Sequence, residues 1–340
     1  MTFSRVCSSA QPPIGSTPLM RLDRINPRDD IRVFAKLEQF NLGGSAKDRT
    51  AQALIEAALN AGDIRAGSTL IESSSGNLGM ALARQAHLAG MHFVCVVDPR
   101  VNRSTVATME AYGARVDMLE HPDPDNGDWL TARRSRVQEL LQDIPDSFNL
   151  NQYANQAAFH AHSEGTMAEI IEQLGAPPSH LLVAMSTTGT LGGCVRKLSE
   201  LGADTETIGV DAEGSVLYGG ARGTRLLPGY GAGVVTELSQ SFEPSLVARV
   251  ADLEAINGAR RLARSEGVLA GASSGAVVAA FLERAAELPS GSTVAMVLHD
   301  GGQPYLDTIY NDAWVTEHFG ISADDLARSV DGQVDDWGSE

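Results

Sequence analysis

The sequence predicts an α/β protein built on mostly parallel sheets. Short apolar runs alternate with amphipathic segments along nearly the whole chain, which is typical of repeated strand–helix–strand units. Continuous apolar runs such as residues 93–97 suit strands that are covered on both faces. Several of these runs lead into loops rich in Ser, Thr and Gly. Ligands of such sheets bind beyond the carboxyl ends of the strands, so we expect function in these loops.

Taken in chain order, the expected strands are apolar or alternating runs bounded by turn residues. They cover residues 32–40, 68–74, 91–98, 114–120, 146–152, 180–186, 206–212 and 292–300. The expected helices repeat apolar residues three and four positions apart. They cover residues 77–90, 104–113, 130–144 and 163–175, and two more follow Lys47 and residues 271–275.

Composition excludes several classes of protein. The 340 residues are 43% hydrophobic, which is enough for a sizeable core. A net charge of -17 argues against non-specific binding of nucleic acid or of an anionic membrane. No apolar stretch reaches the length of a membrane span, and residues 1–13 lack the apolar core of a secretion signal. Cys7, Cys95 and Cys194 lie far apart, so we expect unpaired thiols and a cytoplasmic location.

Lys47 lies where a helix is expected to begin, after a Gly-Gly-Ser turn. The positive end of a helix dipole disfavours a cation. A phosphate-binding P-loop is rejected, because Lys47 follows Ala46 and precedes Asp48. The remaining interpretations are an exposed lysine in a first helical turn, or a neutral amine that forms a Schiff base.

Two loops carry the composition of anion sites. Residues 71–83 run from a strand through Ser-Ser-Ser-Gly-Asn into a helix, where hydroxyls and free amides suit a carboxylate or a phosphate. The alternative for this loop is a helix capped by serine. Residues 183–198 repeat the arrangement with five hydroxyl or glycine residues in a row, and these can wrap a phosphate without a cation.

A fourth loop, at residues 269–285, opens a long apolar helix with Gly-Ala-Ser-Ser-Gly. Ser273 or Ser274 could cap this helix or bond a ligand heteroatom. One lysine, one carboxylate loop, one phosphate loop and one serine loop together predict pyridoxal phosphate as cofactor.

These motifs resemble the cysteine synthase and cystathionine β-synthase family of fold-type-II pyridoxal-phosphate enzymes. The matching segments occur in family order at residues 14–22, 40–49, 73–83, 186–193, 271–276 and 298–310. The resemblance implies a fold like that of tryptophan synthase β, with two three-layer αβα domains. It implies a smaller mobile domain at 46–150 and a larger one at 12–45 plus 151–320. The acidic residues 321–340 are expected to form a mobile tail, in which Trp337 could dock.

The resemblance also assigns roles to single residues. Lys47 would be the Schiff-base lysine and the base that takes the Cα proton. Asn77 would bond the 3-oxygen of the cofactor, and Ser273 would face its pyridine nitrogen. The phosphate cup would consist of Ser186, Thr187, Thr188, Gly189 and Thr190. The substrate α-carboxylate would be held by Ser74, Ser75 and Gln152.

At two positions the sequence differs from ordinary cysteine synthases and resembles one subgroup of the family more closely. Leu78 stands where cysteine synthases usually have threonine, and Tyr153 stands where they usually have phenylalanine. The subgroup is N-(2-amino-2-carboxyethyl)-L-glutamate synthase, best known from staphyloferrin B biosynthesis. It joins O-phospho-L-serine and L-glutamate through an aminoacrylate, on the way to L-2,3-diaminopropionate. A homodimer and an NAD-dependent dehydrogenase as pathway partner are implied.

Phosphate as the leaving group calls for a guanidinium. Arg133 matches the basic position of the subgroup, and we expect it to recognise the phosphate together with Tyr153 and Ser186. For Arg134 and Arg136, a solvated helix face is the preferred interpretation.

Two further groups of basic residues receive weaker interpretations. Arg222 and Arg225 lie in a glycine-rich loop at 218–231 that could close over glutamate, although a mobile loop with solvated arginines is simpler. His160 and His162 point to different faces of a helix and are not expected to bind a metal.

Two other functions stay open. An ordinary cysteine synthase, using O-acetylserine or O-phosphoserine with sulfide, shares every cofactor residue. Only Leu78, Tyr153 and Arg133 argue against it. A non-catalytic scaffold with the same fold is the other alternative, and the intact Lys47 argues against that.

Overall fold

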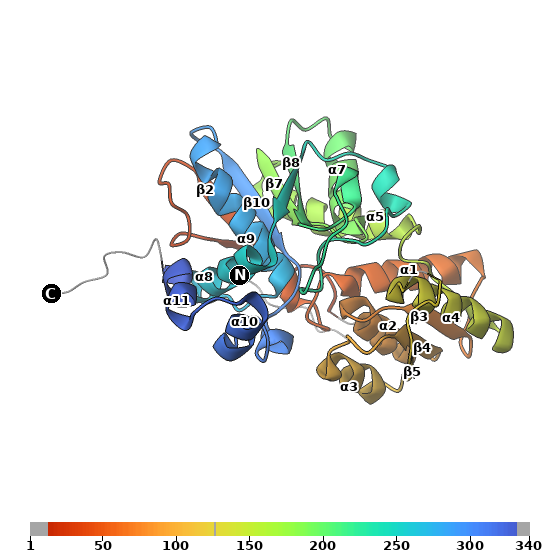
Figure 1. Ribbon diagram of the computed structural model, residues 1–340. Helices are drawn as coiled ribbons and strands as arrows, with labels where there is room; N and C mark the ends of the chain where they lie inside the picture. Colours follow the sequence, from red (N-terminus) through yellow and green to blue (C-terminus); the bar gives the residue numbers. More distant parts are fainter. Residues whose placement is uncertain (1–12, 126, 332–340) are drawn as a thin grey trace.

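Two sheets organise the computed structural model, which describes residues 13–125 and 127–331 (Figure 1). The larger sheet has the strand order β1-β2-β10-β7-β8-β9, and only the β1–β2 pair is antiparallel. Its strands are Leu19–Arg21 (β1), Arg32–Leu37 (β2), Thr293–Leu298 (β10), His180–Ala184 (β7), Glu206–Ala212 (β8) and Leu246–Val250 (β9). The smaller sheet is parallel, in the order β5-β4-β3-β6. Its strands are Arg115–Met118 (β5), His92–Val97 (β4), Thr69–Ser73 (β3) and Ser147–Phe148 (β6).

Helices cover both faces of the smaller sheet. One face packs against the helices Lys47–Ala61 (α1), Asn77–Leu88 (α2) and Arg103–Ala111 (α3). The other face packs against Trp129–Asp143 (α4). Strand β4 shows why: Phe93 and Cys95 point into the first core, whereas Val94 and Val96 point into the second. A strand that is apolar on both faces is therefore buried on both faces, as its continuous apolar run predicts.

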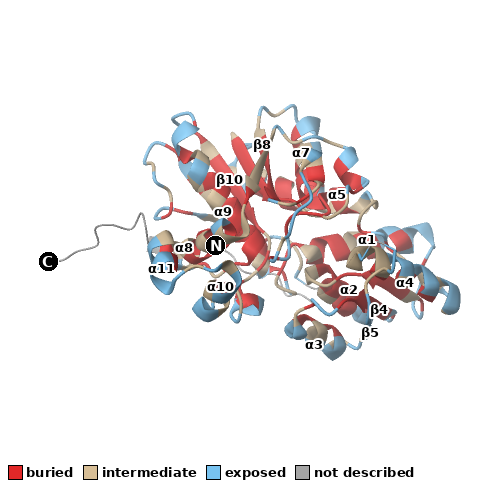
Figure 2. Ribbon diagram, in the orientation of Figure 1, coloured by how far each residue is buried: buried red, intermediate tan, exposed pale blue. Residues whose placement is uncertain are grey.

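The larger sheet is likewise the middle of three layers (Figure 2). One face carries Asp252–Glu266 (α8), Ala272–Arg284 (α9), Asp312–Phe319 (α10) and Ala323–Asp331 (α11). The other carries Ala168–Leu174 (α6), Gly189–Glu200 (α7) and a π-helical turn, His162–Met167 (η2). The short helix Ala157–Ala161 (α5) contacts both α1 and α7, so it connects the two halves.

The predicted fold class is confirmed, and each of the eight expected strands is present within its expected residues. Strands β1 and β9 were not expected. Both are short edge strands of the larger sheet, and they lack a fully buried apolar run. None of the helices in the described part of the chain combines the length and apolar character that a membrane crossing requires.

The prediction of a mobile tail at residues 321–340 is wrong for residues 323–331. Residues 323–331 form α11, and its side chains Leu326 and Val330 are each only 1% exposed in the core beneath α8 and α10. Two apolar residues four positions apart place one face of this acidic helix on the core. Trp337 and the rest of the expected tail, 332–340, lie outside the described residues.

The expected domain boundaries fall between the two sheets. The strands of the smaller sheet span 69–148, and those of the larger sheet span 19–37 and 180–298. The carboxyl ends of β3 and β7 lead into the loops that start α2 and α7, and α2 packs against α1 (Figure 1).

Candidate active site

Lys47 is the first residue of α1, and its side chain is half-buried. The turn before it is held by the Ala46 amide, which donates to the carbonyl of His299 at 2.8 Å. Burial lowers the pKa of the Lys47 amine, and the charge of Asp300 opposes this effect. The site therefore favours the neutral amine that a nucleophile or general base needs.

The loop before α2 offers donors to an anion. Gly76 faces open space, since a Cβ atom built there meets nothing within 4 Å. The first amides of a helix have no partner within the helix and can bind an anion in that space. Ser74 is buried and its hydroxyl oxygen accepts the Gly79 amide at 3.0 Å, whereas Ser75 is half-buried. Of the two predicted serines, Ser75 is the more accessible.

The predicted phosphate cup follows β7 and forms the start of α7, whose first residue is Gly189. Thr188 adopts a left-handed conformation, with φ 71°, which is uncommon outside glycine. Its Oγ1 atom is buried and has no hydrogen-bond partner among the described residues. A strained residue with an unsatisfied buried hydroxyl indicates a ligand position.

Ser273 is the second residue of α9 and is 3% exposed. Gly229, in the loop after β8, approaches it closely: a Cβ atom built at Gly229 would lie 3.7 Å from Ser273 Oγ. The neighbouring Ser274 accepts the His299 amide at 3.1 Å through its Oγ atom. Ser274 is thus engaged with the backbone, and Ser273 is the better candidate for a ligand heteroatom.

Asp300 is a site residue that the sequence did not reveal. It follows β10 and is 4% exposed. Its Oδ2 atom accepts hydrogen bonds from Asn77 Nδ2 at 2.8 Å and from the Tyr305 hydroxyl at 2.7 Å. Burial raises the pKa of its carboxyl, while Tyr305, Asn77 and the charge of Lys47 act in the opposite direction.

His162 is a second residue that sequence reasoning did not place in the site. Its Nε2 atom lies 3.0 Å from Thr50 Oγ1 and 3.3 Å from Thr190 Oγ1, and its Nδ1 atom lies 2.9 Å from Thr166 Oγ1. Burial lowers its pKa well below the ordinary value. A neutral imidazole therefore connects the phosphate cup to the first turns of α1.

Gln152 and Tyr153, which the sequence predicts to bind the substrate, follow the smaller sheet after β6. Gln152 is buried, and its Nε2 atom donates to the carbonyl of Ser73 at 3.0 Å. Burial raises the pKa of the Tyr153 phenol, and the charge of Arg133 lowers it. The charge of Arg134 acts on the Tyr153 phenol in the same direction as that of Arg133.

Arg133 lies on α4 and is 9% exposed. Its Nε atom forms an ion pair with Asp98 Oδ2 at 3.3 Å, and Asp98 is also paired with Arg100 at 2.9 Å. On the same helix Arg134 is exposed, and Arg136 is 33% exposed and pairs with Asp117 at 3.1 Å and with Glu139 at 2.8 Å, so neither contradicts the expected outer face.

The two loop arginines differ from each other. Arg222 is exposed; it donates to the carbonyl of Gly233 and lies 3.9 Å from Asp128, the N-cap residue of α4. Arg225 is half-buried, and it donates to the carbonyl of Tyr230 at 3.4 Å. Burial lowers the pKa of Arg225. The expectation that both arginines are solvated is therefore wrong for Arg225.

The residues present fit pyridoxal phosphate. Thr188 supplies an unsatisfied hydroxyl at the amides that open α7, which suits the phosphate. Lys47 supplies an amine with a lowered pKa for the carbonyl carbon. Asn77 has a second amide hydrogen beyond the one donated to Asp300, and Ser273 carries a hydroxyl that could bond the ring nitrogen.

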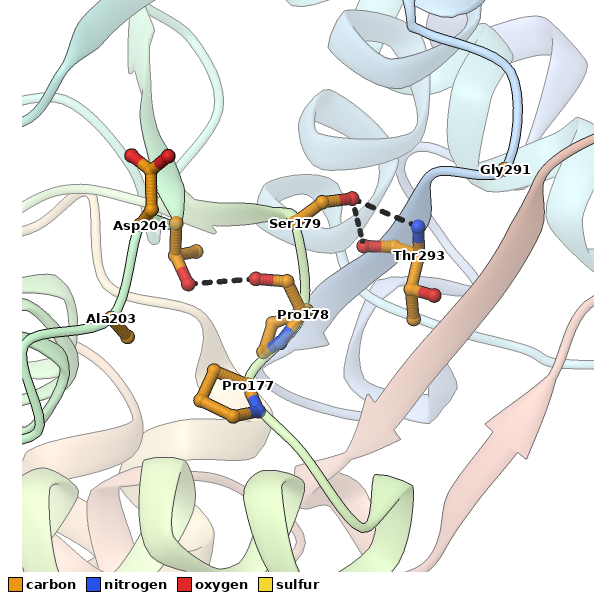
Figure 3. Close-up of a pocket in the computed structure, with 8 residues that line it drawn as sticks. Pro177, Pro178, Ser179, Ala203, Asp204, Gly291 and Thr293 are labelled. Carbon is orange, nitrogen blue, oxygen red and sulfur yellow. Dashed lines mark hydrogen bonds between the residues drawn. The ribbon is translucent and has the colours of Figure 1, made fainter.

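A surface depression elsewhere does not compete with this site. It lies between Pro177–Ser179 and Gly291–Thr293, at the ends of β7 and β10 opposite to the cofactor loops (Figure 3). Its polar groups satisfy one another: Ser179 Oγ donates to the carbonyl of Thr293 at 3.0 Å, and Thr205 Oγ1 donates to that of Pro178 at 2.7 Å.

Known proteins share this fold. The family model for pyridoxal-phosphate-dependent enzymes matches residues 10–300. The O-acetylserine-dependent cystathionine β-synthase of Helicobacter pylori is 30% identical, with a TM-score of 0.83 over 91% of this chain and 100% of that chain. O-ureido-L-serine synthase is 30% identical, with a TM-score of 0.79 over 89% and 97%. A hydrogen sulfide-producing enzyme of Fusobacterium nucleatum is 27% identical, with a TM-score of 0.81 over 89% and 100%.

The fold and the four loops define an enzyme that works with pyridoxal phosphate. The chain belongs to the family of pyridoxal-phosphate-dependent enzymes, in the branch of cysteine synthase and cystathionine β-synthase, which carry out β-replacement on amino acids.

Proposed function

We propose that this chain joins O-phospho-L-serine and L-glutamate into N-(2-amino-2-carboxyethyl)-L-glutamate and releases phosphate. The product would lead to L-2,3-diaminopropionate for siderophores or peptide natural products. The observation that carries the proposal is the buried guanidinium of Arg133, whose charge acts on Tyr153. Its Nε atom is buried and has no hydrogen-bond partner among the described residues, although Asp98 Oδ2 lies 3.3 Å away. A guanidinium can bind a phosphate group bidentately.

The chemistry follows from the residue types. Bound pyridoxal phosphate supplies an electron-withdrawing ring that acidifies the Cα–H bond of an amino acid. Lys47, with its lowered pKa, is the base that takes the Cα proton. Ser273 offers the ring nitrogen a hydroxyl and no charge, which favours loss of the β-substituent over transamination. The Cβ–O bond then breaks, and phosphate leaves toward Arg133 with the bonding electrons. The neutral amine of glutamate forms the new Cβ–N bond, Lys47 returns its proton to Cα, and the amine releases one proton to solvent.

Binding of the two amino acids uses different parts of the site. Ser74, Ser75 and Gln152 hold the α-carboxylate of phosphoserine at the start of α2. Ser186 joins Arg133 at the phosphate. For glutamate, we propose the loop arginines Arg222 and Arg225, because Arg222 lies 3.9 Å from Asp128 at the start of α4 and thus connects the two halves of the protein.

The leaving group is tested by comparing Arg133→Ala on O-phospho-L-serine and on O-acetyl-L-serine. We expect kcat/KM to fall by about 10- to 100-fold on phosphoserine, the usual range for hydrogen bonds to a charged group. The acetyl substrate should lose much less. Arg134→Ala, one position further along α4, is the matched control. Equal losses on both substrates would overturn the role of Arg133.

The nucleophile is tested by supplying phosphoserine with glutamate or with sulfide and identifying the products by mass spectrometry. We expect the glutamate adduct. Cysteine as the only product would overturn the proposed function and leave the family assignment intact.

Cysteine synthase is the second candidate, and one observation favours it. Leu78 stands where cysteine synthases usually have threonine, and it is 2% exposed in the core between α2 and the smaller sheet. Its side chain therefore does not line the loop. Leu78 is thus no argument against sulfide as the nucleophile, and only Arg133 and Tyr153 remain.

A non-catalytic scaffold is distinguished by the visible absorbance of the bound cofactor. Purified protein should show this band, and Lys47→Ala should lose it. If wild-type protein shows no band after incubation with pyridoxal phosphate, the result would support the non-catalytic scaffold.

The proposal also covers the oligomeric state, the cellular location and the partner enzyme of this chain. We infer a homodimer, a cytoplasmic location and an NAD-dependent dehydrogenase as the partner that consumes the product. Phe40 and Leu42 are 60% and 51% exposed, and a second copy of the chain would cover such side chains. Light scattering after size-exclusion chromatography measures the assembly, and a mass of one chain would contradict the dimer.

A further inference from the structure

Asp300 lies where three segments of the cofactor site meet. Its Oδ2 atom accepts from Asn77 Nδ2 at 2.8 Å, which links it to the start of α2. Its backbone forms a bridge with Ser45, two residues before Lys47. Its carbonyl accepts the amide of Gly271, two residues before Ser273, at 3.2 Å. One residue thus contacts the asparagine, lysine and serine loops.

The remaining carboxylate oxygen lies against the start of α9. A Cβ atom built on Gly271 would come within 2.2 Å of Asp300 Oδ1, so a larger residue does not fit there. Gly271 has an ordinary φ of -77°, and its lack of a side chain is therefore explained by this close approach. Oδ1 has no hydrogen-bond partner in the described part of the chain. The positive end of the α9 dipole compensates a negative charge at this position.

The two histidines near Lys47 are neutral, and its chain neighbours Asp48 and Arg49 are held in ion pairs with Arg84 and with Glu38 and Glu169. Burial lowers the pKa of His299 to about 3 and that of His162 well below its ordinary value. Burial and the charge of Asp300 raise the pKa values of the Tyr305 and Tyr310 phenols. Within the described residues, Asp300 is the one acidic group whose charge acts on the Lys47 amine.

We propose that Asp300 is a positioning residue of the cofactor site, with two effects. Its carboxylate fixes the amide of Asn77, so that the second amide hydrogen points at the cofactor ring. Its negative charge stabilises the proton on the Lys47 nitrogen. The inference rests on the cofactor of the family and is independent of the proposed substrates, so failure of one leaves the other standing.

The first measurement is a pH titration of the visible absorbance of the loaded enzyme, for the wild type, Asp300→Asn and Asp307→Asn. Asp300→Asn keeps the shape and removes the charge. Asp307 is exposed seven residues further along and provides the same substitution as a control. We expect the midpoint of Asp300→Asn to lie lower by about one pH unit or more, as for loss of an opposite charge close by. Asp307→Asn should titrate like the wild type.

The second measurement is the affinity for pyridoxal phosphate, followed by fluorescence of the cofactor-depleted protein. Asp300→Asn should weaken binding several-fold, because Asn77 loses its fixed acceptor. A titration midpoint and an affinity equal to those of Asp307→Asn would overturn the inference.

If Asp300→Asn does not fold, Tyr305→Phe tests the same inference. This variant keeps the charged residue and removes one of the two hydrogen bonds to Oδ2. The carboxylate then holds a proton more readily, so the midpoint should move in the same direction by a smaller amount. An unchanged midpoint in Tyr305→Phe would equally contradict the role of Asp300.

Discussion

Glu72 provides a quantitative test of the electrostatics beside the substrate loop. It precedes Ser73 at the end of β3 and is 3% exposed. Its Oε1 atom accepts the Ser73 amide at 3.0 Å, and its Oε2 atom has no hydrogen-bond partner in the described part of the chain. Burial raises its pKa from 4.5 to about 7, although Ser73 and nearby donors act against this. The folded protein therefore binds a proton that the unfolded chain releases.

The sign of the effect on stability follows from this difference. A carboxyl group with a raised pKa stabilises the fold fully below pH 4.5, and this contribution is lost as the pH rises through about 7. The two pKa values differ by an amount that corresponds to about 3 kcal/mol. Glu72→Gln cannot ionise, so its free energy of unfolding should exceed that of the wild type by up to about 3 kcal/mol above pH 8. At acidic pH the two proteins should be nearly equal.

Unfolding in urea, followed by tryptophan fluorescence at acidic and at alkaline pH, measures this difference directly. Glu110→Gln, on the exposed surface of α3, is the control and should show the same small effect at both pH values. A difference between Glu72→Gln and the wild type that does not change with pH would refute the assigned ionisation of Glu72.

Three further changes test the packing that supports the site, each by the free energy of unfolding. Leu326→Ala should lower the free energy of unfolding by about 2–5 kcal/mol, because α11 packs on the core. Unchanged stability would instead support the prediction that this segment is a mobile tail. Gly275→Ala should cost about 1–3 kcal/mol, since its Cβ would lie 2.0 Å from the carbonyl oxygen of Ala255 in α8. Arg84→Met should cost about 3–5 kcal/mol by leaving Asp48, its partner at 2.6 Å, buried without a countercharge. Adding Asp48→Asn should recover part of that loss, and no recovery would contradict the pairing.

The sequence predicted those parts of the fold that depend on local patterns. Strand β4 is apolar on both faces and lies in the middle of its sheet, so its continuous run was sufficient. Edge strands carry less signal. Strand β9, Leu246–Val250, is buried only at its last residue, and β1 has three residues. The acidic composition of α11 concealed the two apolar residues that attach it to the core.

The site residues also divide into those that a local sequence pattern predicts and those that only the fold brings together. Lys47, Ser273 and the threonines of the phosphate cup lie in loops whose composition is unusual by itself, so the sequence predicted a cofactor there. Asp300 and Asn77 are 223 positions apart, and no local pattern connects them. In the sequence, Asp300 followed by two glycines looks like an ordinary turn. The role of Asp300 depends on its burial and on its distant partners, which only the folded chain brings together.

The three residues that separated this chain from cysteine synthases do not carry equal weight. Leu78 is a core residue and cannot select a nucleophile directly. Arg133 is buried, and its charge lowers the pKa of the Tyr153 phenol. The role that we propose for this pair concerns the leaving group, whereas the choice of glutamate rests on the subgroup resemblance and on the loop of Arg222. A protein that prefers phosphoserine but accepts sulfide is compatible with every contact of Arg133, so leaving group and nucleophile must be measured separately.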